Sequence, residues 1–311
     1  MRVHLDTDFA GDTDDACALA MLLGWPGAEV VGITTTADPG GERAGYVDSF
    51  LRLAGRDDIP VAAGASASLT TGMPMGALPD HDVYWGEELV VPRPSSEDAA
   101  LQLIARSADQ GATIIAIGPY TNLARLEATR PGQLGGTAVV LMGGWVRPPT
   151  EGLPAWGPEM DWNVQCDTQA ALTVFYASED LTLVTLPATL NAHLRAAHLE
   201  QLVAFGPMGQ LLARQALAHG TEHDKGELGR AHAGLPDDLL NFQYDPVACA
   251  VALSWPGVVV EAVTLGPVLE EDVLRFQPDD GGKPVDVVID VDGPGFAETW
   301  LAAVERVGHG Q

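Results

Sequence analysis

Five aspartates lie within ten residues near the N-terminus of this chain, between an apolar strand pattern and an apolar helical pattern. Their positions are Asp6, Asp8, Asp12, Asp14 and Asp15. Carboxylates this close repel one another, and a divalent cation with hard oxygen ligands is the simplest group that would hold them together. The chain has only two lysines, Lys225 and Lys283, so we do not expect a local ammonium group to supply the charge. The segment predicts a metal site at the carboxyl end of a strand.

Two simpler interpretations account for only part of the cluster. Asp14 or Asp15 could cap the following helix, which leaves the other acids unexplained. The spacing also resembles a calcium-binding EF-hand loop. However, that loop needs a bidentate glutamate at its twelfth position, where this chain has Cys17, and its fifth position is Ala10. The flanking strand and helix patterns also differ from the two helices of an EF-hand.

Composition limits the classes of partner. The chain has 311 residues, 46% of them apolar, and a net charge of −27. This charge argues against nucleic acids and anionic membranes and favours a small neutral molecule. No apolar run approaches the ~20 residues of a membrane span. Three widely spaced cysteines and an N-terminus without a leader pattern predict a reduced, cytoplasmic protein.

Apolar strand patterns alternate with helical patterns along the chain. Strands are predicted over 2–6, 29–35, 60–63, 113–117, 138–142, 181–186, 258–265 and 285–290. Helices are predicted over 14–24, 42–54, 97–109, 121–129, 167–177, 195–218, 246–254 and 294–306. This alternation predicts one α/β domain over 1–311, with a mostly parallel, Rossmann-like central sheet flanked by helices. Ligands of such sheets bind beyond the carboxyl ends of the strands, where the aspartates lie.

Two long polar stretches, 145–162 and 219–243, have no clear periodicity. Long loops in a compact domain are often functional lids, so we expect both to be flaps over the active site.

Oxygen-bearing side chains also follow other predicted strands. Thr121 and Asn122 follow the strand over 113–117, Asp161 lies in the first polar stretch with Asn163 directly after it, and Asp245 precedes Pro246. Helix capping explains each of these locally. Together they place oxygen ligands at several strand-to-helix junctions, which share one edge of a parallel sheet.

These motifs resemble those of the calcium-dependent nucleoside hydrolases, the inosine-uridine preferring nucleoside N-ribohydrolase type. Segment 6–15 is similar to the family's Asp-x-Asp-Pro-Gly-x-Asp-Asp motif with two extra residues. Further similar segments are 54–61, 64–65, 118–124, 139–144 and the Asp-Pro-x-Ala at 245–248. The order and spacing match over residues 2 to about 305. The resemblance implies a nucleoside hydrolase fold and hydrolysis of a ribonucleoside to ribose and free base.

The resemblance also implies a role for individual residues. The Ca²⁺ ligands would be Asp8, Asp15, Asp245 and the backbone carbonyl of Thr121. Asp8 would also be the general base for a water held by the ion. Substrate contacts would come from Asp14, Met142, Asp161, Asn163 and His81, with Asp6 supporting the cluster from behind. Such an acidic site suits the chemistry, because breaking the C1′–N bond develops positive charge on the ribose.

Three differences from the family lie on the recognition side, one of which is Asp161-Trp162-Asn163 in place of the family's sugar-binding Glu-Phe-Asn. Tyr244 stands where the family commonly has a histidine before Asp-Pro, sometimes assigned as the acid for the leaving base. The turn over 34–40 lacks an asparagine that would touch the sugar. We expect Tyr244, or one of His219, His223 and His232, to protonate the leaving base.

Two alternative functions remain open from the sequence. A haloacid-dehalogenase-type phosphatase also begins with a strand and Asp-x-Asp, but it needs a lysine for the phosphate. A non-catalytic, calcium-dependent nucleoside or sugar-binding homologue would keep the metal site and lose turnover. The resemblance further implies a homodimer or homotetramer.

Overall fold

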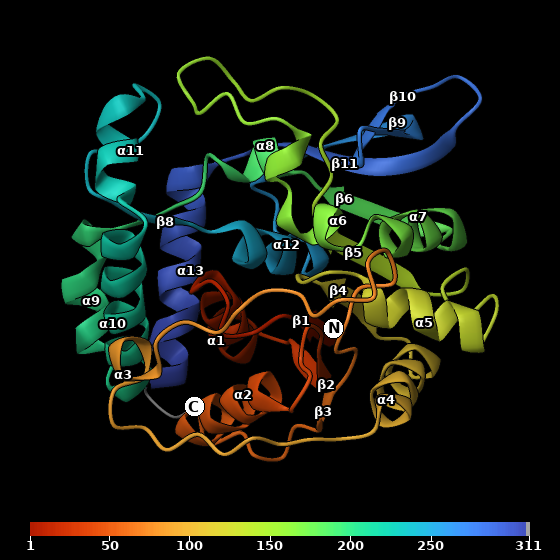
Figure 1. Cartoon of the computed structure of the whole chain (residues 1–311). Helices are drawn as coiled ribbons and strands as arrows, with labels where there is room; N and C mark the ends of the chain where they lie inside the picture. The colour runs from red at the N-terminus through yellow and green to blue at the C-terminus, as the bar shows by residue number, and fades with distance from the viewer. Residues whose placement is uncertain (309–311) are drawn as a thin grey trace.

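A twisted central sheet organises the molecule, which the computed structural model describes over residues 1–308 (Figure 1). Its strands are β1 (Arg2–Thr7), β2 (Glu29–Thr35), β3 (Val61–Ala63), β4 (Thr113–Ala116), β5 (Ala138–Met142), β6 (Asp180–Val184), β9 (Val258–Glu270), β10 (Val273–Pro278) and β11 (Lys283–Val291). Within the described residues these nine strands are ordered β10-β9-β11-β6-β5-β4-β1-β2-β3. A separate antiparallel pair consists of β7 (His193–Arg195) and β8 (Leu239–Phe242).

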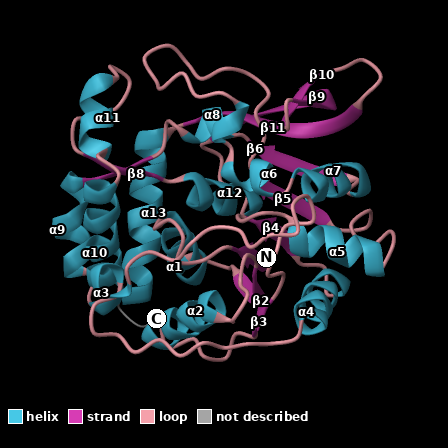
Figure 2. Cartoon of the chain, viewed as in Figure 1, coloured by secondary structure: helices cyan, strands magenta, loops and turns pink. Residues whose placement is uncertain are grey.

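Helices flank this sheet (Figure 2). The longer ones are α1 (Asp14–Gly24), α2 (Glu42–Leu53), α4 (Glu97–Asp109), α5 (Thr121–Thr129), α7 (Thr168–Ala177), α10 (Pro207–Glu222), α12 (Tyr244–Ala252) and α13 (Gly293–Gly308). The shorter ones are α3 (His81–Tyr84), α6 (Trp162–Cys166), α8 (Leu186–Thr189), α9 (Leu199–Ala204), α11 (Lys225–Ala231), and the 3₁₀ turns η1 (Pro158–Met160) and η2 (Ala196–His198).

Strands β1 to β6 and β11 pair in parallel, and β9 pairs antiparallel with β10 and β11. Parallel strands covered on both faces need continuous apolar runs, which the valines and isoleucines of β4 and β5 provide. Helix α1 packs against α12 and α13 and is buried on almost all sides. A side chain at Gly24 would lie 1.9 Å from the carbonyl of Ala303, so glycine is required where α1 meets α13.

The predicted fold class is confirmed: the molecule has an α/β fold with a large, mostly parallel sheet flanked by helices. The eight predicted strands correspond to β1–β6, β9 and β11, but β10 was not predicted. The helix predicted over 195–218 is wrong, because β7, η2 and α9 precede α10. Gly206 has a φ of 86° and Pro207 begins α10, so α9 and α10 are two separate helices.

The second polar stretch contains more regular structure than its sequence pattern indicated. Helix α10 continues to Glu222, α11 follows, and β8 ends the stretch at Phe242.

The three cysteines are free thiols, as expected. None of the helices in residues 1–308 combines the length and apolarity needed to cross a bilayer. Residues 309–311, the end of the predicted domain, lie outside the described residues.

Candidate functional site

A cavity of about 540 Å³ lies at the carboxyl ends of β1, β4 and β5, within the ~300–1,000 Å³ range of small-molecule sites. Six aspartates line it: Asp8, Asp12, Asp14, Asp15, Asp161 and Asp245. They come from the loop after β1, the start of α1, the start of α6 and the first turn of α12. The strand-to-helix junctions therefore meet at one sheet edge, as the sequence predicted.

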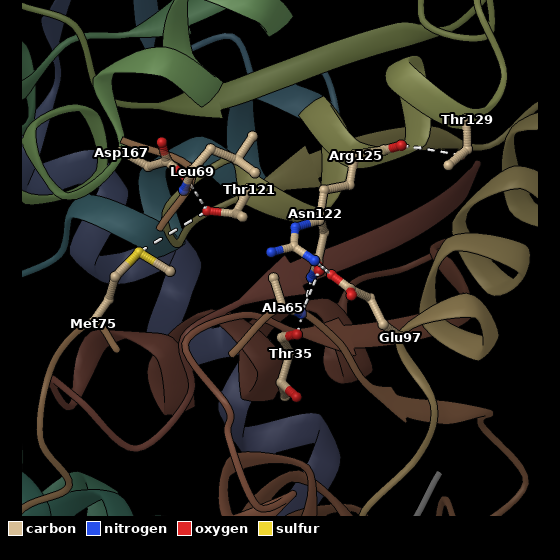
Figure 3. A network of polar contacts seen from close by, with 10 residues as sticks. All are labelled: Thr35, Ala65, Leu69, Met75, Glu97, Thr121, Asn122, Arg125, Thr129 and Asp167. Carbon is tan, nitrogen blue, oxygen red and sulfur yellow. Dashed lines mark hydrogen bonds and ion pairs between the residues drawn. The ribbon is translucent and has the colours of Figure 1, made fainter. Parts of the chain in front are cut away.

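Buried polar contacts behind the cavity tie the strand ends together (Figure 3). Asn122 Nδ2 donates to Asp6 Oδ1 (2.7 Å) and to the carbonyl of Thr35 (2.9 Å), and its Oδ1 accepts from the Ala65 amide (2.8 Å). Asp6 Oδ1 also accepts from the Thr34 hydroxyl (2.5 Å). Asp6 thus joins β1 to β2 and α5, and its predicted role in supporting the cluster stays a prediction.

Replacing Asn122 with alanine should reduce the free energy of unfolding by about 2–4 kcal/mol, because three buried hydrogen bonds would be lost and the buried Ala65 amide would be left unpaired. Chemical denaturation of the purified protein measures this change. Asn191→Ala is the control, since Asn191 makes a single 3.2 Å bond to Asp290 and should cost about 1 kcal/mol or less. Equal effects of the two variants would contradict this role for Asn122.

Three of the six aspartates form a compact oxygen cluster. Asp14, Asp15 and Asp245 each offer a carboxylate oxygen, and these oxygens lie within 4.8 Å of one another. All three side chains are buried. Asp15 accepts from the Thr7 hydroxyl, and Asp14 Oδ2 accepts from the Asp245 amide at 3.2 Å. Two neutral donors cannot offset three buried negative charges, so this donor set fits a hard divalent cation.

Asp8 lies near this cluster without being part of it; burial raises the pKa of Asp14, Asp15 and Asp245, and the charge of Asp8 adds to the shift. A side chain at Gly118, in the turn after β4, would lie 2.6 Å from the Asp8 amide, so glycine allows this close approach. Asp8 Oδ2 accepts from the indole Nε1 of Trp162 at 3.2 Å. Burial raises the pKa of Asp8, and the neighbouring Arg43 opposes this shift.

Burial dominates the acidity of the whole cluster. It raises the pKa of Asp14, Asp15 and Asp245 well above the usual range, and their mutual repulsion adds to the shift. Burial also raises the pKa of Asp6 to about 7 and that of Asp161 to about 6. The metal-free protein therefore favours protonated carboxyl groups, whereas a bound cation requires ionised ones.

These shifts predict how the metal-free protein responds to pH. A carboxyl group whose pKa is higher in the folded state stabilises the fold below its unfolded value of about 4. That stabilisation is lost as pH rises through the folded values, here about 6 for Asp161 and about 7 for Asp6. The melting temperature measured in chelator should therefore fall between about pH 5 and pH 8, and added Ca²⁺ should reduce the fall. A metal-free melting temperature that rises over this interval would contradict the assignment.

One expectation about the cluster is wrong: cationic side chains do lie beside it. Arg43, from the first turn of α2, is only 2% exposed and lines the cavity. Its Nη1 donates to the carbonyls of Asp8 and Phe9, and its Nε donates to the carbonyl of Ala37. Lys225 also lines the cavity. The count of lysines overlooked arginine, and the six carboxylates of the lining still outnumber its two cations, Arg43 and Lys225.

The opposite side of the cavity contains the residues predicted to contact the sugar. Asp161 Oδ2 accepts from the Gly144 amide (2.5 Å), which fixes the loop after β5. Asn163 Nδ2 donates to the carbonyls of Ile117 (2.9 Å) and Met142 (3.0 Å). Met142, Asp161 and Asn163 all line the cavity.

Other predicted site residues lie elsewhere. Among the described residues that line the cavity, Asp6, Thr121 and His81 are absent. Thr121 is buried at the start of α5, where its hydroxyl donates to Asp167 Oδ2 at 2.7 Å (Figure 3). Both ring nitrogens of His81 are engaged, with the Tyr46 hydroxyl and the Glu88 carbonyl, each at 3.0 Å.

Aromatic side chains line part of the cavity, and the sequence predicted only some of them. Trp156 and Tyr244 line it, and both rings pack on Phe242, at 5.5 and 5.4 Å between centroids. His219 and His223, at the end of α10, also line the cavity, with 4.3 Å between their ring centroids. The sequence raised Tyr244, His219 and His223 as candidate acids but not Trp156. It gave no signal that they gather at one end.

Comparison with known proteins shows the family to which the chain is related. The model of the inosine-uridine preferring nucleoside hydrolase family matches residues 3–298. The pyrimidine-specific ribonucleoside hydrolase RihA of Salmonella agona is 31% identical over 301 residues, covering 92% of this chain and 93% of that protein. RihA of Citrobacter koseri is 29% identical over 301 residues, with 92% of each chain covered.

Solved structures share the fold. A purine-preferring ribonucleoside hydrolase from Gardnerella vaginalis superposes with a TM-score of 0.79 at 22% identity, covering 99% of each chain. A plant nucleoside hydrolase, PpNRh1, gives 0.78 at 22% identity, covering 97% of this chain and 98% of its own.

The fold and the acidic cavity thus define a hydrolase of N-glycosidic bonds. The chain belongs to the inosine-uridine preferring nucleoside hydrolase family, whose members are metal-dependent and act on ribonucleosides. The phosphatase alternative is therefore wrong, and the non-catalytic alternative gives way to an enzyme.

Proposed function

We propose that this enzyme uses Ca²⁺ to hydrolyse a ribonucleoside, or a related N-riboside, to ribose and free base. The observation that carries this proposal is the buried cluster of Asp14, Asp15 and Asp245, whose oxygens lie within 4.8 Å of one another. Hard carboxylate ligands favour Ca²⁺ or Mg²⁺ over softer metals, and a flexible set of carboxylate and carbonyl ligands suits Ca²⁺. We assign Asp8, Asp15, Asp245 and the carbonyl of Thr121 as ligands.

When bound, the ion would orient the attacking water, lower its pKa and anchor the ribose hydroxyls. Asp8 would accept the proton from that water. Its carboxylate lines the cavity, and its position is fixed by the Trp162 indole and the backbone contacts of Arg43. Burial raises its pKa toward the range of an effective base at neutral pH.

Asp14 would hold the ribose hydroxyls, and Met142, Asp161 and Asn163 would line the sugar site. The carboxylates would stabilise the positive charge that develops on the ribose as the C1′–N bond breaks. We leave His81 out of the substrate site, because its ring nitrogens bond to Tyr46 and Glu88. Tyr244, His219 and His223 line the cavity and are the candidates for the acid that protonates the leaving base, whereas His232 is not among the described residues that line it.

We further propose a cytoplasmic homodimer or homotetramer, in which segments 145–162 and 219–243 act as flaps. Trp156 and Met160 from the first segment and His219, His223 and Lys225 from the second line the cavity, which supports this role. Size-exclusion chromatography with light scattering would measure the oligomeric state, and a monomeric mass at micromolar concentration would contradict it.

Metal analysis tests the choice of ion. Calorimetric titration of chelator-treated protein should give one tight Ca²⁺ site per chain, and activity should return in proportion to the sites filled. Restoration of activity by Zn²⁺ but not by Ca²⁺ would contradict the proposed ion.

A further inference from the structure

Asp167 is a buried carboxylate to which the proposed reaction assigns no role. It ends α6, begins α7 and is 0% exposed. Its Oδ2 accepts from the Thr121 hydroxyl (2.7 Å) and the Leu69 amide (2.8 Å). Its Oδ1 accepts from the Thr70 amide (3.1 Å) and hydroxyl (2.9 Å) and from the Ala170 amide (3.2 Å). The contact with Ala170 is a helix cap, whereas the other partners are 46 to 98 positions away, so capping explains only one of these contacts.

Thr121 is the partner that leads to the proposed metal site. It is the first residue of α5, it is 0% exposed, and its carbonyl is one of the assigned Ca²⁺ ligands. Its hydroxyl donates to Asp167, and Met75 Sδ lies 4.0 Å from the same hydroxyl (Figure 3). Partners that orient a metal ligand are commonly worth about 10–100-fold in metal affinity. The bond to Asp167 is therefore expected to influence how well Thr121 serves as a ligand.

Leu69 and Thr70 connect Asp167 to residues 68–77, which we call the wall segment. The segment begins with a turn in which its first amide donates to the carbonyl of residue 73 at 3.0 Å. It ends at Gly76 and Ala77, which line the cavity. Thr70 Oγ1 also accepts from the Gln169 amide at 2.9 Å, so the turn is attached to the start of α7.

The wall segment packs against side chains beside Asp8. A side chain at Gly76 would lie 3.2 Å from Arg43 Nη2 and 3.3 Å from Trp162 Cζ2, so the segment approaches both residues closely. Arg43 donates to the carbonyl of Asp8, and Trp162 donates to its Oδ2. Trp162 also begins α6, the helix that Asp167 ends. A displaced wall segment would therefore change the lining beside the proposed general base.

We propose that Asp167 is a positioning residue that holds the assigned metal ligand Thr121 and the wall segment in one fixed arrangement. This inference rests on the proposed Ca²⁺-dependent hydrolysis. One carboxylate oxygen binds Thr121 and Leu69 and the other binds Thr70, so these residues are fixed relative to one another. Asp167 acts on metal binding through Thr121 and on substrate binding through the wall segment. The two effects can be separated, because each depends on a different threonine hydroxyl.

Thr121→Val tests the contact with the metal ligand. It removes the hydroxyl and keeps both the carbonyl and the shape of the side chain. Calorimetric titration of the chelator-treated variant should give a Ca²⁺ affinity about 10-fold lower than that of the wild type. In saturating Ca²⁺, KM for uridine or inosine, whichever the wild type cleaves faster, should stay within about twofold, because the wall segment keeps its own bonds. An unchanged Ca²⁺ affinity would overturn the proposal.

Thr70→Val tests the contact with the wall segment and leaves Thr121 bonded to Asp167. KM for the same nucleoside should rise about three- to tenfold, the scale of one hydrogen bond. The Ca²⁺ affinity should stay within about twofold of the wild type, because the bond that orients the metal ligand is kept. The value of kcat should change less than KM, since a loosened wall weakens binding of substrate and transition state alike. An unchanged KM would equally overturn the proposal.

Asp167→Asn should combine both effects, because one of its two acceptor oxygens becomes an amide group that faces donors. Thr299→Val is the matched control, since the Thr299 hydroxyl donates to the Gly295 carbonyl within α13 at 2.8 Å. It should leave both Ca²⁺ affinity and KM unchanged. If Asp167 only stabilises the fold, Thr121→Val and Thr70→Val will lower the melting temperature without changing Ca²⁺ affinity or KM, and that result would overturn the inference alone. Wild-type protein that binds no Ca²⁺ and cleaves no nucleoside would instead overturn the proposed function, and this inference with it.

Discussion

Replacing Asp15 with asparagine is expected to lower Ca²⁺ affinity by at least about 100-fold, the upper range for residues that only support a metal ligand. The Asp15 side chain is 2% exposed and shares the oxygen cluster with Asp14 and Asp245. Asparagine keeps the shape and can still accept from the Thr7 hydroxyl, so the change removes charge and little else. Activity at limiting Ca²⁺ should fall in parallel.

The same variant should have the opposite effect on the metal-free protein. Asp15 repels its neighbours when no cation is present, and burial raises the pKa of all three carboxyl groups. Asp15→Asn should therefore melt at a higher temperature than the wild type in chelator, and at a lower one in saturating Ca²⁺. Calorimetric titration and thermal denaturation measure the two effects. The exposed Asp57, between α2 and β3, supplies the control Asp57→Asn, and unchanged Ca²⁺ affinity in Asp15→Asn would contradict the ligand assignment.

The second large effect is expected at Asp8. Asp8→Asn should lower kcat by about 10³-fold, within the range of 10²–10⁴ for loss of a general base. The amide oxygen can still accept from the Trp162 indole, so the side chain should keep its place. KM should change much less than kcat, because proton transfer occurs only in the transition state.

Because Asp8 is also assigned as a ligand, these assays need saturating Ca²⁺, with occupancy measured in the same samples. A loss of kcat that higher Ca²⁺ restores would assign Asp8 to metal binding alone. A fully occupied variant with wild-type kcat would contradict any role for Asp8 in proton transfer.

The sequence predicted the parallel part of the sheet because its signals are local. Strands such as β4 and β5 are short apolar runs, and each is followed by turn and helix patterns. The edge strand β10 was missed because only Leu274 and Phe276 of its six residues are buried, so its apolar pattern is short. The break at Gly206 and Pro207 was overlooked because apolar helical periodicity resumes directly after it.

The acidic part of the site was also predictable, because Asp8, Asp14 and Asp15 are close in sequence. Arg43 and His219 were harder to place, since their neighbours in the site are distant along the chain. Arg43 donates to the carbonyl of Asp8, which is 35 positions away in the sequence. His219 lies next to Asp12 only because α10 packs beside the loop after β1. Of the 16 lysines and arginines only two are lysines, and no sequence pattern distinguishes Arg43 from the other arginines.

The central claim is Ca²⁺-dependent release of ribose, and a reducing-sugar assay over a panel of purine and pyrimidine nucleosides tests it most directly. Each substrate would be assayed with added Ca²⁺, with chelator, and after Ca²⁺ is restored. We predict release from at least one nucleoside that chelator abolishes and Ca²⁺ recovers. Absence of ribose across the panel from folded, Ca²⁺-loaded protein, or release that chelator leaves unchanged, would contradict it.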